Sequence, residues 1–166
     1  MTLLKLLSKM KRHPALLSLS HDHHHGLFLA QLIKKDAPEY KGLPKDLNGK
    51  INYTIDIYNS SLKKHFDNEE NILFPFLRGK DEFLDNLILE IINEHRLLEN
   101  LIAKLYNSLD QINLLDKIGN ILGEHIRKEE RILFEKSQTV LTEDEIIIIG
   151  VKLNSSSINE NESCGN

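Results

Sequence analysis

Two histidine–glutamate pairs in this sequence have the residue types and the spacing of metal ligands. His65 precedes Glu69 by four residues, and His125 precedes Glu129 by the same interval. Residues four apart lie on the same face of a helix, one turn above each other. An imidazole nitrogen and a carboxylate oxygen placed in this way can point at one metal ion, and such ligands suit iron, zinc or manganese.

The two pairs belong to a ten-residue repeat. Segments 65–74 and 125–134 are identical at six of ten positions, namely the His, both Glu, the Ile, the Leu and the Phe. This repeat indicates a two-fold arrangement in which each half contributes matching groups to one centre. Both glutamates share a helical stripe with aliphatic residues, and an unpaired buried carboxylate costs several kcal/mol. A metal ion would supply the missing positive charge.

Two further histidines complete the predicted ligand set. His95 lies on the apolar stripe of a third helical segment. In the first segment either His23 or His24 should face the core, because His23 aligns with Leu27 and Ala30 while His24 lies on the neighbouring edge; the sequence leaves this choice open. Six such ligands fill most positions around two metal ions rather than one, and two glutamates can bridge two ions because each carboxylate has two oxygens. The predicted metal ligands are His23, His24, His65, Glu69, His95, His125 and Glu129.

Four long segments carry these residues, at about 14–35, 46–75, 81–109 and 113–136. Their apolar residues recur every three or four positions, which is the helical period. On this period Ile72 and Ile132 fall on the inner stripes of the second and fourth segments, and Pro75 and Gly79 should close the second segment. Long amphipathic segments with short connections predict an all-α, antiparallel up-down four-helix bundle with a short N-terminal helix and a short C-terminal helix. We expect four regions: an N-terminal amphipathic segment (1–13), the bundle (14–137), a C-terminal helical appendage (138–153) and a disordered tail (154–166).

The C-terminal appendage has a recognisable beginning. Thr142 and Glu145 form a capping-box pattern, in which each side chain can satisfy the other's free backbone N–H. The Ile146–Ile149 run that follows is too short to span a membrane. It predicts a helix docked on the bundle, with an edge strand as the alternative.

The composition narrows the functional class. The 166 residues are 40% hydrophobic and 28% charged and include no Trp, which suits a soluble helical domain. A net charge of −4 gives no basic surface for nucleic acid, and no apolar run is long enough for a secretory signal or a membrane span, so we expect no nucleic-acid or membrane partner and a cytoplasmic location. The single cysteine, Cys164, excludes an intrachain disulfide.

The order of these motifs resembles the hemerythrin-like (HHE cation-binding) family. That family has a histidine on the first helix, H-x-x-x-E on the second, a histidine on the third and H-x-x-x-E on the fourth. The similarity covers roughly residues 14–136 and includes the local context Asp22-His23-His24-His25-Gly26-Leu27 and Glu94-His95. The resemblance implies two iron ions bridged by Glu69 and Glu129, which can also share an oxo or hydroxo group, and a small ligand such as dioxygen, nitric oxide or peroxide.

One position departs from the oxygen-carrying members. They have two histidines four apart on the third helix, whereas this chain has His95 followed by Glu99. We expect Glu99 to be an exposed helix residue, with an extra ligand as the alternative. The change disfavours reversible oxygen carriage and favours redox reaction or sensing. The alternative hypothesis is a sensor or iron-handling module whose structural metal is read by a partner protein. No residue is assigned a catalytic role, and no redox partner is identified.

Overall fold

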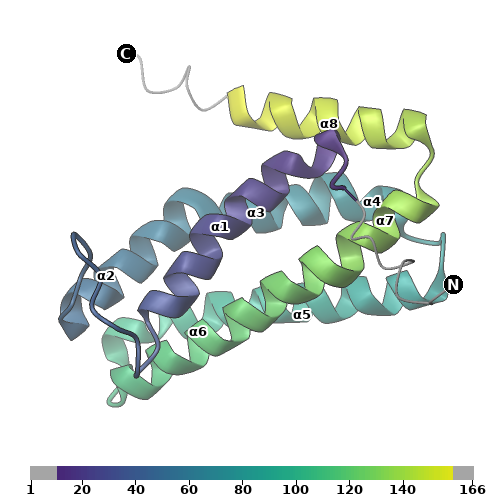
Figure 1. Cartoon of the computed structure of the whole chain (residues 1–166). Helices are drawn as coiled ribbons and strands as arrows, with labels where there is room; N and C mark the ends of the chain where they lie inside the picture. Colours follow the sequence, from purple (N-terminus) through teal and green to yellow (C-terminus); the bar gives the residue numbers. More distant parts are fainter. Residues whose placement is uncertain (1–10, 159–166) are drawn as a thin grey trace, which may run out of the picture.

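The computed structural model describes residues 11–158, and Figure 1 shows their arrangement. All regular structure in this range is helical, which confirms the predicted all-α class. The predicted N-terminal helix falls mostly on residues 1–10, outside the described range. The helical elements are a 3₁₀ turn Pro14–Leu16, α1 Leu17–Leu32, α2 Leu47–Ile57, α3 Lys63–Asn68, α4 Phe74–Leu77, α5 Glu82–Ala103, a 3₁₀ turn Leu105–Asn107, α6 Gln111–Lys128, α7 Phe134–Val140 and α8 Glu143–Ile158.

Three π-helical turns connect some of these helices into longer rods. The turn Tyr58–Leu62 joins α2 to α3, Glu69–Leu73 joins α3 to α4, and Glu129–Leu133 joins α6 to α7. The two later turns each begin at a glutamate of the repeated motif. Wide turns of this kind are rare and occur frequently at functional sites.

The π turns correct one sequence prediction. The 3.6-residue period placed Ile72 and Ile132 on the inner stripe of their helices. In the structure the next residue is buried instead: Leu73 and Leu133 are fully buried, whereas Ile132 is 42% exposed. A π turn holds more residues than an α turn, so it moves the inward face one position along the chain.

Aspartates cap the N-termini of three long helical segments. The side chains of Asp46, Asp81 and Asp110 accept hydrogen bonds from backbone N–H groups in the first turns of α2, α5 and α6. The second rod was expected to end at Pro75 and Gly79. Pro75 instead lies within α4, and the chain turns at Gly79, whose φ of 77° favours glycine.

The long helices pack side by side around two apolar clusters. Helix α6 packs against both α1 and α5 (Figure 1), and a Cβ at Gly119 would lie only 2.7 Å from the backbone oxygen of Ala30, so glycine permits the close approach of α1 and α6. One cluster contains Phe66 and Ile126, and the other contains Phe74 and Phe134. The histidines and glutamates of the repeated motif fall between these two clusters along the rods.

The C-terminal helix α8 covers the second cluster. Thr142 and Glu145 satisfy each other's backbone N–H as the capping box predicts, at 2.9 and 3.3 Å. Ile146 and Ile149 are buried, so this run is a docked helix and not an edge strand. The helix continues to Ile158, so the disordered tail expected from residue 154 is wrong for 154–158; the rest of it, 159–166, lies outside the described residues. In the described range no helix is long and apolar enough to cross a membrane.

Candidate metal centre

Six of the seven predicted ligands meet in the interior. Each is at most 3% exposed, and they come from α1, from the rods that contain α3 and α6, and from α5. The seventh, His24, is exposed and stays outside the group, because one residue along a helix rotates the side chain by about 100°. The structure thus selects His23 between the two first-helix candidates. The six residues are His23, His65, Glu69, His95, His125 and Glu129.

These residues form two groups that share both glutamates. His23 and His65 join Glu69 and Glu129 in the first group, and His95 and His125 join the same glutamates in the second. In each group every residue offers one ligand atom, and these atoms lie within 4.8 Å of one another. Two adjacent sites with two common carboxylates are the arrangement that the repeat predicts.

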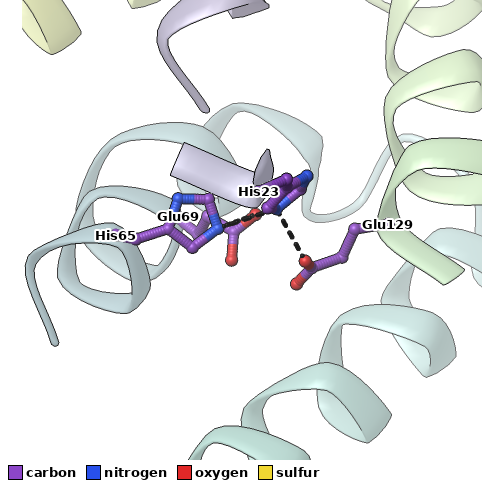
Figure 2. A group of neighbouring side chains, drawn as sticks. All are labelled: His23, His65, Glu69 and Glu129. Atoms are coloured by element: carbon purple, nitrogen blue, oxygen red, sulfur yellow. Dashed lines mark hydrogen bonds and ion pairs between the residues drawn. The ribbon is translucent and has the colours of Figure 1, made fainter. Parts of the chain in front are cut away.

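Figure 2 shows the first group. The Nε2 atoms of His23 and His65 lie 2.9 Å apart, and His23 Nε2 lies 3.0 Å from Glu129 Oε2. The Oε1 atom of Glu69 lies 3.6 Å from His65 Nε2. Two nitrogens bound to one ion at about 2.1 Å and at a right angle are about 3 Å apart, so the histidine spacing fits a shared ion.

The second group uses the other oxygen of each glutamate. Glu69 Oε2 lies 3.4 Å from His95 Nε2, and Glu129 Oε1 lies 2.9 Å from His125 Nε2 and 3.7 Å from His95 Nε2. Each carboxylate therefore turns one oxygen to each pair of histidines. This is the orientation that a carboxylate needs in order to bridge two metal ions.

Six buried polar atoms at the centre lack hydrogen-bond partners. Both oxygens of Glu69 and of Glu129 are buried without a hydrogen bond, and so are the Nε2 atoms of His95 and His125. Buried polar groups are rarely left unsatisfied, and a buried carboxylate without compensation is costly. The residues present therefore fit metal ions at this position, where the unpaired oxygens and nitrogens would become ligands.

An acidic residue holds the outer nitrogen of each histidine. His23 Nδ1 donates to Glu130 at 2.7 Å, and His95 Nδ1 donates to Glu70 at 2.8 Å. The second glutamate of each repeat thus supports the buried histidine of α1 or α5. This bond fixes the ring orientation and the tautomer, leaving Nε2 free to bind metal.

The histidines of the two motifs are held by acids from α1 and α5. His65 Nδ1 lies 3.3 Å from Asp22, and His125 Nδ1 donates to Glu94 at 2.8 Å. Asp22 and Glu94 each directly precede the buried histidine of their own helix, so the two-fold pattern extends to this outer layer.

Cations in turn hold three of these four acids. Arg12 binds Glu130 at 2.8 Å, and short ion pairs join Arg96 to Glu70 and Lys128 to Glu94. From the sequence, Glu70 and Glu130 are expected to be solvated, with support of the metal ligands as the alternative, and Asp22 and Glu94 have no assigned role. The signal that points to all four is an acidic residue beside each motif glutamate and directly before His23 and His95, but their partners lie 25 to 107 positions away along the chain and are fixed by helix packing.

The acids also change the proton affinity of the centre. Burial lowers the pKa of His23, but the carboxylates of Glu129 and Glu130 outweigh it and raise that pKa to about 9. For His125, burial is again outweighed, mainly by Glu129, and the pKa rises to about 10. Burial raises the pKa of Glu129, but the neighbouring histidines lower it well below its ordinary value. Without metal, protons on His23, His95 and His125 therefore balance the charge of the buried carboxylates.

Glu99, the departure on the third helix, does not join the centre. Its carboxylate pairs with Arg96 on the same helix at 2.9 Å, and it belongs to neither group of converging ligand atoms. The structure therefore gives no support to an extra ligand, and the side chain is half-buried rather than exposed.

The comparisons with known proteins agree with this geometry. Residues 14–137 match the hemerythrin HHE cation binding domain. The chain belongs to the hemerythrin HHE cation-binding family. No curated protein and no solved structure matches the chain. Members of this family bind metal cations, usually iron, and the two His/Glu groups of this hemerythrin-like chain are the residues that fit such ions.

Proposed function

We propose that this hemerythrin-like protein holds two iron ions, bridged by Glu69 and Glu129, and that the pair binds, senses or reacts with a small ligand such as dioxygen, nitric oxide or peroxide. The observation that carries the proposal is the sharing of both glutamates between two groups of converging ligand atoms. One ion would leave half of these buried donors without compensation. The proposal includes an antiparallel up-down order for the long helices.

The protein's residues have distinct parts in this proposal. Nε2 of each histidine donates to an ion, while the acid on Nδ1 holds the proton that keeps the ring in the binding tautomer. The apolar clusters on both sides of the centre, one around Phe66 and one around Phe74, restrict the access of water. Bound iron would supply redox-active ions, each with coordination positions that four protein donors do not fill.

The test begins with protein purified without oxygen and assayed for iron. It is then exposed separately to oxygen, peroxide and nitric oxide while its absorption spectrum is recorded. About two irons per chain and a spectrum that responds to at least one of these molecules are expected. Two bound irons that respond to none would favour a structural metal read by a partner protein. A chain that folds equally well after chelation and never takes up iron would contradict the proposal.

A further inference from the structure

A pocket of about 430 Å³ is lined by His23 and other residues of α1 and by residues of the rod formed by α6 and α7. Its volume is in the range of pockets that hold small ligands. One wall contains the ring of His23, and apolar side chains, Leu27 and Ile126, form another part of the lining. The pocket therefore adjoins the candidate metal centre through His23, and it also includes Glu130, which holds the outer ring nitrogen of His23.

The remaining lining is strongly cationic. Arg12, Arg127 and Arg131 line the pocket, and the only carboxylate among the lining residues is Glu130. Glu130 is already engaged, because it accepts hydrogen bonds from both Arg12 and His23. This excess of positive charge runs against the net charge of −4 of the whole chain. A local reversal of this kind attracts anions.

Arg12 is a fixed part of the pocket. Its guanidinium donates to the backbone oxygen of Glu130 at 2.7 Å and stacks over the ring of Phe134 at 5.0 Å. Its side chain is only 11% exposed. A guanidinium held in this way loses little conformational freedom when a ligand arrives.

Arg127 and Arg131 have no ion-pair or hydrogen-bond partner for their side chains among residues 11–158. They are four residues apart on the same rod, where like charges repel each other. An anion between them would relieve this repulsion. Arginine is also the residue best suited to bind carboxylate or phosphate oxygens through two parallel hydrogen bonds.

We propose that this pocket binds a small organic anion, with its carboxylate or phosphate group on Arg127 and Arg131 and its apolar part against Leu27 and Ile126. The site does not require metal, since none of its anion-binding residues is a metal ligand. The carboxylate and the phosphate share the same recognition chemistry, and the experiment below distinguishes them.

The test measures binding of three probes by calorimetry at low ionic strength: inorganic phosphate, phenyl phosphate and benzoate. It uses the full chain, both metal-free and iron-loaded. We expect phenyl phosphate or benzoate to bind in both forms, and the tighter of the two identifies the preferred head group. R127Q/R131Q should weaken that binding at least tenfold while leaving the iron content and the thermal unfolding midpoint unchanged.

The matched control is K63Q/R78Q, which removes the same charge from two exposed residues that do not line the pocket. It should bind the probe as the unmodified protein does. Equal weakening in the control would show attraction by overall charge alone and overturn the proposal. Failure of both organic probes to bind at millimolar concentration would also overturn it, and so would unchanged binding to R127Q/R131Q. None of these results bears on iron stoichiometry, so the proposed function is tested separately.

Discussion

The two halves of the metal centre have the same ligands but different support. In the first half, Asp22 lies 3.3 Å from His65 and is 38% exposed, and no cation pairs with it among the described residues. In the second half, Glu94 holds His125 at 2.8 Å and is itself paired with Lys128. The ring of His65 is therefore held loosely and that of His125 firmly, whereas His23 and His95 have similar acidic support, at 2.7 and 2.8 Å.

The ring contacts also differ between the halves, although all four histidines are at most 3% exposed. His95 stacks on the ring of Phe66, with ring centres 4.0 Å apart. His23 stacks on Phe134 at 5.3 Å and also lines the pocket beside Arg12. The contrast between the halves therefore lies in the residues around the ligands and not in the ligands themselves.

The largest effect should come from the residues that the two halves share. E69A/E129A removes both shared carboxylates, so each ion loses two ligands and the iron content should fall from about two per chain to none. The measurement is iron content after loading and desalting. E124A, which alters an exposed glutamate on α6, is the control and should keep its iron. Retention of one iron by the double variant would show that a half-site can bind metal without the shared carboxylates.

Substitution of Glu94 and of Asp22, the acids that contact His125 and His65, should lower the metal affinity by different amounts. E94Q replaces a firm, partly buried hydrogen bond to His125, and loss of such a partner typically weakens metal affinity by about 10- to 100-fold. D22N replaces a longer and more exposed contact to His65, so it should weaken affinity less than about tenfold. Competition with a colorimetric chelator measures both. Equal losses in the two variants would show that the difference in support has no energetic consequence.

Metal removal should reveal the same contrast in the native protein. With a chelator in excess, iron should leave in two phases, because the half with His23 and His65 is the less firmly held. D22N should accelerate the fast phase, and E94Q should accelerate the slow phase. A single phase in the native protein, unaffected by either substitution, would contradict two unequal positions.

Iron affinity should also depend on pH. His23 has a pKa of about 9 and His125 one of about 10 in the metal-free protein, so both carry protons at pH 7 and must lose them to bind iron. Affinity should therefore increase from pH 7 to about 10 and then level off, and protons should be released on binding at pH 7. Calorimetry in buffers of different ionisation enthalpy measures this release. Binding at pH 7 without proton release would contradict it.

The sequence predicted which of these side chains meet in the interior, because their positions depend on local helical spacing. Four-residue intervals placed His65 with Glu69 and His125 with Glu129 on common faces, and the helical class followed from the same period. Sequence spacing could not choose between His23 and His24, because adjacent residues on one helix both lie near the core edge. Burial of His23 alone resolved the choice.

The features that the sequence did not predict correctly have three different physical causes. Ile132 was placed inward because a regular period was assumed, and a π turn shifted the buried position to Leu133. The support of His23 by Glu130 joins residues 107 positions apart, so it depends on how α1 packs against the rod that contains α6. The end of α8 was placed too early because its last residues are polar, although the helix continues through them.

Anomalous X-ray diffraction at the iron edge is the most direct test of whether two ions share Glu69 and Glu129. We expect two iron peaks about 3.5 to 4 Å apart, one beside His23 and His65 and the other beside His95 and His125. A single peak, or iron bound away from these residues, would contradict it.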